Sequence, residues 1–348
     1  MTHVAALPQW KVVRTDAELR MPRVDAKLRA AGARLVHLPD GVSEDVLARE
    51  VADADLLLMC YSRITARIID QASRLKAIIK YGVGIDAIDI VAARLPGIPV
   101  VNVPRYAEET VAEGAFFLMM SLAKRMKPLQ RAMQDSGWVW PEPAWLAHDL
   151  AGKTLGLVGL GHIGRNVARM AAAFRMRVLA CDPHWAHVPA DLAVQRCDDL
   201  GEMLAQSDFV SIHCVLNDQT RHLIGASQFD RMKPGVFLVN VSRGEIVDEV
   251  ALLAALQAGR IAGAALDVYG TEPLRREGHP LSALYTMDNV LLWPHLTFYT
   301  HEAMQRLEDE TLARCFEAFE GRPLSVYSTD PRLRAQRSGV RLVDPPAG

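Results

Sequence analysis

Three polar residues follow apolar runs that read as strands, and their side chains are suited to binding an anion and moving a proton. Arg243 lies in V-N-V-S-R-G-E-I-V-D, Glu272 in A-L-D-V-Y-G-T-E-P-L and His295 in V-L-L-W-P-H-L-T-F-Y. An arginine binds a carboxylate with two hydrogen bonds and polarises the neighbouring carbonyl. A histidine exchanges a proton with the carbonyl oxygen, and a glutamate on its other ring nitrogen favours the imidazolium. The set suits proton transfer to a carbonyl as hydride reaches it.

Each of these residues also has a structural interpretation. An arginine after a strand is often a surface ion-pair partner, a glutamate before proline is often only a loop residue, and a histidine after proline is usually structural. The joint position favours chemistry, because open α/β sheets bind ligands at the carboxyl ends of their strands.

A glycine-rich turn stands at the same predicted edge. The segment T-L-G-L-V-G-L-G-H-I-G-R carries G-x-G-x-x-G at Gly159, Gly161 and Gly164, between an apolar strand and a helix. Gly159 permits the turn, Gly161 lets the backbone approach a pyrophosphate, and Gly164 lets the helix pack on the strand. A turn that merely connects strand and helix is the alternative.

Asp182 supports a dinucleotide. It directly follows the strand R-V-L-A-C, 18 residues past Gly164, which is close to the spacing of the ribose-binding acid. Its charge would repel a 2′-phosphate, and no arginine follows it in D-P-H-W, so NAD is predicted in preference to NADP.

The surrounding pattern alternates strands with helices, which predicts parallel sheets. The expected strands are 11–14, 34–37, 55–59, 76–80, 154–158, 177–181, 209–213, 236–241, 262–268 and 290–293. The expected helices are 21–31, 43–52, 65–71, 108–124, 248–258 and 301–319. Residues 134–148 are expected to cross into a second domain, and the tail from Gly321 shows little periodicity.

Bulk composition narrows the function. The 348 residues are 50% hydrophobic with a formal net charge of −2, which gives no global attraction for nucleic acid or an anionic membrane. The first ten residues lack the pattern of a secretory signal, and no apolar run reaches the length of a membrane span. The five cysteines are scattered without a CxxC pair, which predicts a reducing, cytoplasmic location and no metal site.

The ordered motifs resemble the D-isomer-specific 2-hydroxyacid dehydrogenases, over about residues 55–319. Besides the segments above, the matching stretches are Y-G-V-G-I-D at 81–86, N-V-P-R-Y-A-E-E-T-V-A-E at 102–113, H-C-V-L-N-D-Q-T-R-H-L-I at 213–224 and M-K-P-G-V-F-L-V-N-V-S-R-G at 232–244. The resemblance implies a Rossmann-like NAD-binding domain, 114–299, inserted into a discontinuous flavodoxin-like substrate domain, 1–113 plus 300–348. It also implies an active site in the cleft between the domains and a homodimer formed through the cofactor domain.

Residue roles follow from the same resemblance. The catalytic set would be Arg243, Glu272 and His295. Besides the glycines and Asp182, the cofactor would contact Thr110, His162, Ile163, Val241, Ser242 and Asp267. The substrate carboxylate would be held by Arg243 and the backbone of Val83 and Gly84, with Ser62 and Phe298 also near the substrate.

Two departures leave the substrate open. His213-Cys214-Val215-Leu216-Asn217 replaces the frequent H-x-P-L-T, and Leu296-Thr297-Phe298-Tyr299 follows the histidine where many members have small residues. The second stretch is similar to the branch containing the C-terminal-binding-protein corepressors. Phe298 either lines the substrate site or packs the hinge, and Arg63 either meets a second anionic group or is a solvated surface residue.

Two functions follow as hypotheses. The first is NAD(H)-dependent interconversion of a D-2-hydroxy acid and its 2-keto acid. The second is an NAD-responsive dimeric binding module with little turnover, against which the complete catalytic set argues. A zinc- or iron-dependent dehydrogenase is a weaker third hypothesis.

Overall fold

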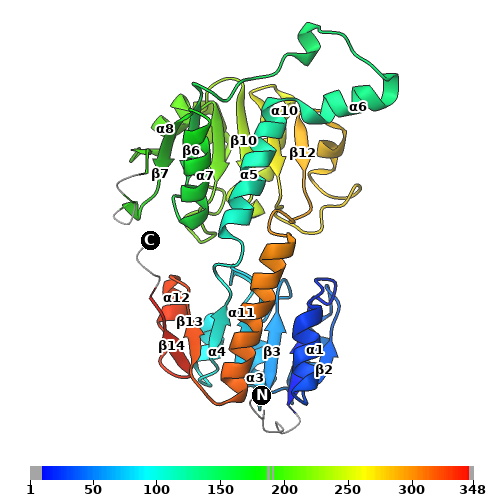
Figure 1. Ribbon diagram of the computed structural model, residues 1–348, viewed down its shortest axis with the longest axis vertical. Helices are drawn as coiled ribbons and strands as arrows, with labels where there is room; N and C mark the ends of the chain where they lie inside the picture. The colour runs from blue at the N-terminus through cyan, green and yellow to red at the C-terminus, as the bar shows by residue number, and fades with distance from the viewer. Residues whose placement is uncertain (1–9, 186–188, 190–191, 345–348) are drawn as a thin grey trace. The chain divides into compact units, whose positions relative to one another are not determined.

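The computed structural model describes residues 10–185, 189 and 192–344 and divides the chain into two compact units (Figure 1). The first unit comprises residues 1–107 and 300–348, and the second comprises residues 108–299. The first nine residues, from which the absence of a secretory signal was inferred, lie outside the described residues.

The first unit is built on a five-stranded parallel sheet in the order β2-β1-β3-β4-β5. Its strands are β1 (Lys11–Arg14), β2 (Arg34–His37), β3 (Leu56–Met59), β4 (Ala77–Lys80) and β5 (Val100–Asn102). This order is that of flavodoxin-like folds, as predicted. Because β1, β3 and β4 are almost wholly buried, they read in the sequence as short apolar runs.

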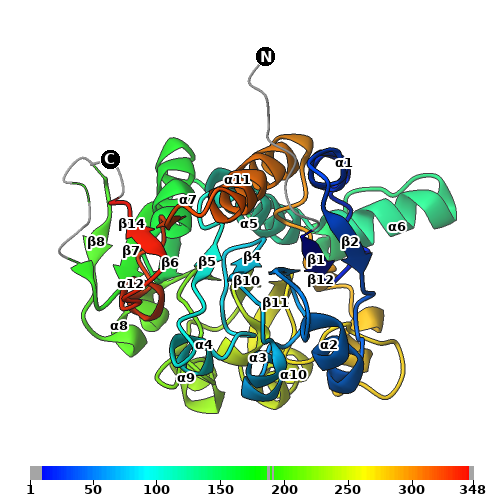
Figure 2. The same cartoon turned by 90° about the horizontal axis from the view of Figure 1, so that it is seen from below.

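Helices cover both faces of this sheet. Figure 2 shows α1 (Pro22–Ala30) and α11 (His301–Phe319) on one face, and α2 (Glu44–Val51), α3 (Ala66–Gln71) and α4 (Ile90–Arg94) on the other. Ser43, Thr65 and Asp89 cap the last three by accepting hydrogen bonds from backbone N–H groups in the first turn.

The C-terminal segment is more ordered than its sequence suggests. It forms β13 (Leu324–Val326), α12 (Pro331–Arg334) and β14 (Val340–Leu342), with β13 and β14 paired in parallel. Glu317 of α11 accepts hydrogen bonds from the backbone N–H and the hydroxyl of Ser325, at 2.9 and 2.8 Å, and pairs with Arg314 at 3.0 Å. These strands are too short to leave a periodic signal, and buried polar contacts fix them instead.

The second unit is built on a seven-stranded parallel sheet in the order β12-β11-β10-β9-β6-β7-β8. Its strands are β6 (Thr154–Val158), β7 (Arg177–Cys181), β8 (Gln195–Arg196), β9 (Phe209–Ile212), β10 (Val236–Asn240), β11 (Ile261–Leu266) and β12 (Val290–Leu292). The order reverses between β6 and β9, as in the Rossmann fold, and open sheets of this kind bind ligands at such a switch point. The predicted α/β class is confirmed.

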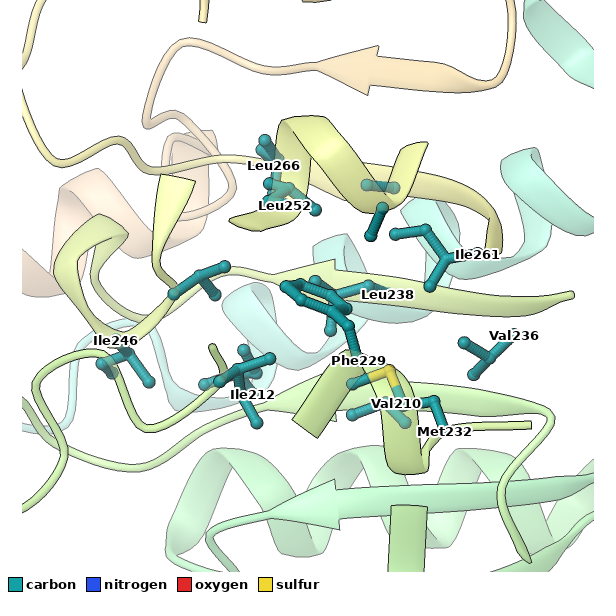
Figure 3. Close-up of a cluster of buried hydrophobic side chains, with 14 of the residues drawn as sticks. Val210, Ile212, Phe229, Met232, Val236, Leu238, Ile246, Leu252, Ile261 and Leu266 are labelled. Carbon is teal, nitrogen blue, oxygen red and sulfur yellow. The ribbon is translucent and has the colours of Figure 1, made fainter. Parts of the chain in front are cut away.

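Two apolar clusters fix the helices of this unit to the faces of its sheet. One contains α5 (Glu108–Ala123) and α7 (His162–Ala173). The other contains α8 (Leu200–Gln206), α9 (Ala226–Arg231) and α10 (Glu249–Gln257), and Figure 3 shows part of it around Phe229 and Leu238. Alternate residues of β10 divide between the clusters: Val236 and Leu238 join one, while Phe237 and Val239 join the other.

The entry into the second unit differs from the expectation. The predicted boundary at residue 113 falls inside α5, which belongs entirely to the second unit, whereas the predicted boundary at 299/300 coincides with the observed one. Residues 134–148 are not the crossover. They lie within the second unit, partly in α6 (Met126–Ser136), a helix that the sequence pattern does not predict.

Among the described helices, none is both long enough and apolar enough to cross a membrane.

Candidate active site

The predicted catalytic residues lie on three neighbouring loops of the second unit. Arg243 follows β10, Glu272 follows β11 and His295 follows β12. These strands are adjacent and parallel in the sheet, so their loops leave from one edge. The carboxyl ends of the strands therefore gather an arginine, a glutamate and a histidine that are separated by 52 residues in the chain.

Glu272 and His295 form a hydrogen-bonded pair. Nδ1 of the imidazole lies 2.8 Å from Oε2 of the carboxylate. The second carboxylate oxygen accepts a hydrogen bond from the backbone N–H of Tyr269 at 3.0 Å. Both carboxylate oxygens of Glu272 are thus engaged, and its side chain is held toward the ring.

The charge state of Glu272 follows from these contacts. Burial favours the neutral carboxyl, but the hydrogen bond and charge of His295, the Tyr269 amide and the charge of Arg243 together hold its pKa below the ordinary value. The carboxylate therefore stays ionised above that lowered pKa, and its negative charge is lost as the pH falls through it.

Asp267 fixes the loop that carries His295. It is 1% exposed. Its carboxylate accepts hydrogen bonds from the backbone N–H groups of Leu296 and Thr297, at 2.8 and 3.1 Å, and from the Thr297 hydroxyl. His295 itself has a positive φ of 56°, which is uncommon for a non-glycine residue and is held here by the anchored loop. The observed contacts of Asp267 position the histidine, and the cofactor contact that the resemblance implies for it stays a prediction.

The buried environment of Asp267 opposes its charge. Burial raises its pKa, while the hydrogen bonds from Thr297 and Leu296 and the charge of His295 act in the other direction. These donors stabilise the carboxylate, so the position of the loop and the ionisation of Asp267 depend on each other.

Thr297 and Phe298 complete the support of His295. A Cβ at Gly114 of α5 would lie 2.8 Å from Cβ of Thr297, so only glycine allows this close approach. Phe298 is buried, and its ring meets those of His295 and Tyr299 edge to face, at centroid distances of 6.3 and 5.9 Å. Phe298 therefore packs against the ring of His295, and its contact with substrate stays a prediction.

The Arg243 loop is held by Asn240 and Gly244. The buried Asn240 side chain donates to the carbonyl of Arg243 at 2.9 Å and accepts from the N–H of Ser242 at 3.1 Å. A Cβ at Gly244 would lie 1.9 Å from the carbonyl carbon of Tyr269. The loop that carries Arg243 therefore packs its backbone directly on the loop that leads to Glu272.

The glycine turn has the shape that a pyrophosphate requires. A Cβ at Gly159 would collide with the backbone of Cys214, and one at Gly164 would lie 2.5 Å from the Gly159 carbonyl oxygen. A Cβ at Gly161 would meet nothing within 4 Å, and α7 begins there without a side-chain cap. Two glycines are required for packing and the third leaves an open helix N-terminus, so these residues fit a dinucleotide phosphate group.

Asp182 lies beside this turn. Its carboxylate accepts hydrogen bonds from the N–H of Leu160 at 2.6 Å and from the N–H of His184 at 2.7 Å. The predicted ribose-binding acid is therefore also part of the turn, because it fixes the peptide between Gly159 and Gly161.

The other predicted cofactor residues lie in the same unit. Thr110 is buried on α5, and Val241 and Ile163 pack on the apolar cluster beneath α5 and α7. The His162 ring lies 3.7 Å from the Glu108 carboxylate, and the Ser242 hydroxyl donates to the Cys214 carbonyl. Their contacts to a cofactor stay predictions.

The predicted substrate residues Ser62, Val83 and Gly84 belong to the first unit. The Ser62 hydroxyl donates to Asp16 at 2.9 Å, and the same carboxylate accepts hydrogen bonds from the N–H groups of Cys60, Tyr61 and Ser62. Ser62 therefore helps to fix its own loop, and the contacts of Ser62, Val83 and Gly84 with substrate stay predictions. Val83 is 44% exposed, Gly84 is half-buried and Arg63 is exposed.

Sequence reasoning missed the residues that support the site: Asn240, Tyr269, Thr297 and Asp16. Asn240 and Asp16 stand at or just after strands, which is a usable signal for a side chain that caps a loop. Nothing local marks Thr297 or Tyr269, because their partners are brought together only by the sheet.

The chain is similar to known dehydrogenases over the segments that carry these loops. The sequence model described as D-isomer specific 2-hydroxyacid dehydrogenase, NAD binding domain, matches residues 116–297. The glyoxylate reductase of Korarchaeum cryptofilum is 39% identical over 271 residues, which are 77% of this chain and 80% of that protein. The D-3-phosphoglycerate dehydrogenase of Archaeoglobus fulgidus is 38% identical over 269 residues, or 77% of this chain, but the match spans only 50% of that protein.

A solved structure shows the same similarity. The D-lactate dehydrogenase of Aquifex aeolicus, complexed with NAD and lactic acid, matches with a TM-score of 0.80 and 30% sequence identity. The match covers 89% of this chain and 96% of that chain.

The contact at Gly244 gives a prediction. Gly244→Ala should lower the free energy of unfolding by about 1–3 kcal/mol, since the methyl group forces the two loops apart. Urea denaturation measures this loss. Gly225→Ala is the control, because its Cβ would be in ordinary contact, 3.6 Å from the Gln228 side chain. Equal stability of the two variants would contradict the assigned packing.

Proposed function

Because the chain belongs to the D-isomer specific 2-hydroxyacid dehydrogenase family, we propose that it interconverts a D-2-hydroxy acid and its 2-keto acid with NAD(H). The observation that carries the proposal is the 2.8 Å pair of Glu272 and His295, on loops next to that of Arg243. NAD(H), when bound to the glycine turn, supplies or accepts the hydride.

His295 is the proposed general acid and base. Since Glu272 occupies Nδ1, Nε2 is the ring atom that would give a proton to the keto oxygen in reduction and take it from the hydroxyl in oxidation. The ionised Glu272 stabilises the imidazolium and fixes the plane of the ring. Asp267 holds the loop that carries the ring, and Phe298 packs edge to face against the ring itself.

Arg243 is the proposed anion-binding residue of the second unit. A guanidinium beside the reacting carbonyl can bind a carboxylate and stabilise negative charge that develops on the oxygen. Asn240 and Gly244 set the backbone from which this side chain leaves, which supports a fixed rather than a mobile cation.

Two further expectations concern assembly and location. A homodimer formed through the second unit is supported by apolar exposure after α6, where Trp138, Trp140 and Leu146 are 63%, 76% and 72% exposed. The cytoplasmic location stays a prediction from the composition.

The test of the reaction is NADH oxidation against glyoxylate, pyruvate, hydroxypyruvate, phenylpyruvate and phosphohydroxypyruvate. At least one should be reduced, and His295→Ala should lower its turnover by about 10²–10⁴-fold while leaving NADH affinity unchanged, because only proton transfer is removed. His301→Ala, an exposed histidine at the start of α11, is the control.

Two outcomes would count against this assignment. Full turnover in the His295→Ala variant would remove the acid–base role. No turnover by the wild type on any acid, together with dimerisation in sedimentation experiments only when NADH is present, would favour the binding module.

The Glu272 carboxylate predicts a pH dependence. Glu272→Gln keeps the hydrogen bond but removes the charge that favours the imidazolium, so kcat/KM for reduction should fall by roughly ten-fold or more on the alkaline side and less at acidic pH. Initial rates between pH 5 and about pH 9 measure this, with the exposed Glu277→Gln as control. A loss that is equal at every pH would refute the electrostatic role.

Asp182 is proposed to select NADH over NADPH. Asp182→Asn keeps an acceptor for one amide but removes the charge that repels a 2′-phosphate, so the preference for NADH should fall by about ten-fold. Kd values of both nucleotides, from quenching of tryptophan fluorescence, measure the ratio. Asp198→Asn, an exposed site with the same charge change, should leave the ratio as in the wild type.

A further inference from the structure

The turn after β4 in the first unit has backbone N–H groups for which the described residues provide no acceptor. Within the described part of the chain, no hydrogen bond is found from the N–H of Val83, Gly84 or Ile85. The carbonyls before them are occupied: Gly82 accepts from the N–H of Val103, and Val83 accepts from the Asn102 side chain at 2.6 Å. Successive N–H groups that have no acceptor can bind an anion, and we refer to those of Val83, Gly84 and Ile85 as the nest.

A buried ammonium lies directly under this turn. Lys80 is the last residue of β4 and is 6% exposed. Its Nζ lies 3.2 Å from the position that a Cβ of Gly82 would take. Gly82 has a positive φ of 154°, so this residue is suited both to the turn and to the close approach of the lysine.

Among the described residues, no carboxylate pairs with the Lys80 ammonium. Nζ donates to the carbonyl oxygen of Cys60, lies 3.4 Å from the Cys60 sulfur and 5.5 Å from the centre of the Tyr61 ring. Burial of a charge without a counter-charge is costly, and its electrostatic effect on a nearby anion is weakly screened.

The other buried basic side chains of the described residues each pair with a carboxylate. Lys11 pairs with Asp53 at 2.6 Å, Arg14 with Asp25 at 3.2 Å and Arg314 with Glu317 at 3.0 Å. Lys80 is the fourth, and no ion pair to a carboxylate is found for it in the described chain. Its charge is therefore available to an anion outside the protein.

We propose that Lys80 is a positioning residue that charges the nest at Val83–Ile85 for the carboxylate of the 2-keto acid. This inference rests on the proposed function. The nest donates the hydrogen bonds, and the ammonium beneath it supplies the long-range attraction that distinguishes an anionic keto acid from a neutral carbonyl compound. The cost of the unpaired buried charge is offset when the carboxylate binds.

The test must separate charge from structure, since Lys80 also ties the β3 loop to β4 through the Cys60 carbonyl. Lys80→Gln keeps a donor for that carbonyl and removes the charge, Lys80→Met removes both, and Lys80→Arg keeps the charge. Lys27→Met, on the exposed side of α1, is the matched control. Thermal melting verifies that each variant is folded.

Two measurements are made on the full chain. Steady-state reduction of glyoxylate should show KM raised by about ten-fold or more in Lys80→Gln and Lys80→Met, with kcat and NADH affinity nearly unchanged. Calorimetric titration with oxalate in the presence of NAD⁺ should show a Kd weakened by a similar factor. Lys80→Arg should recover part of both losses, and Lys27→Met should behave as the wild type.

Defined results would overturn the proposal. The first is an unchanged KM and oxalate affinity in folded Lys80→Gln. The second is an increase in KM that is accompanied by weaker NADH binding and a lower melting temperature and that Lys80→Arg does not reverse. If the wild type reduces none of the keto acids, the proposed function fails separately. The oxalate titration then still decides, because equal binding by wild type and Lys80→Gln, or binding by neither, refutes a charged nest.

Discussion

The buried carboxylate of Asp267 is the contact on which the geometry of the candidate active site depends. It stands after β11 and takes the N–H groups of Leu296 and Thr297 from the loop after β12, so it sets where His295 leaves the sheet. Such hydrogen bonds to a buried charge are strong and directional. The positive φ of His295 and its pairing with Glu272 are both compatible with this anchored loop.

The same construction recurs at the edges of both sheets. Asp182 follows β7 and accepts from Leu160 in the turn after the neighbouring β6. Asp16 follows β1 and accepts from residues 60–62 after the neighbouring β3. The loops at the carboxyl ends of parallel strands lie at one edge of the sheet. An acid at the end of one strand can therefore fix the loop that follows a neighbouring strand. The fold thereby turns mobile connections into defined positions for functional groups.

Charge is used differently in the two units. Around His295 the ionised carboxylate of Glu272 has its hydrogen-bond partner within the protein, so the pair is complete before a ligand arrives. Under the turn at Gly82 the ammonium of Lys80 donates to the Cys60 carbonyl, and no carboxylate pairs with it in the part of the chain that the structure describes. Within that part, the N–H groups of Val83, Gly84 and Ile85 have no acceptor. The first arrangement suits proton transfer and the second suits capture of an anion. A 2-keto acid presents both needs, a carbonyl oxygen to protonate and a carboxylate to bind.

The sequence by itself determined the elements and the residue types at their ends. The buried strands of both sheets appear as apolar runs, and Arg243, Glu272, His295 and the glycine turn are recognisable because each directly follows such a run. Only the tertiary structure decided which groups meet: Asp267 with the histidine loop, Gly244 with Tyr269, and Lys80 with the Cys60 carbonyl. Short elements such as β5, β13 and β14 were likewise decided by packing and buried polar contacts, because three residues are too few to carry a periodic pattern. Local spacing records the period of an element, whereas hydrogen-bond partners and the absence of a counter-charge depend on residues that are distant in the chain.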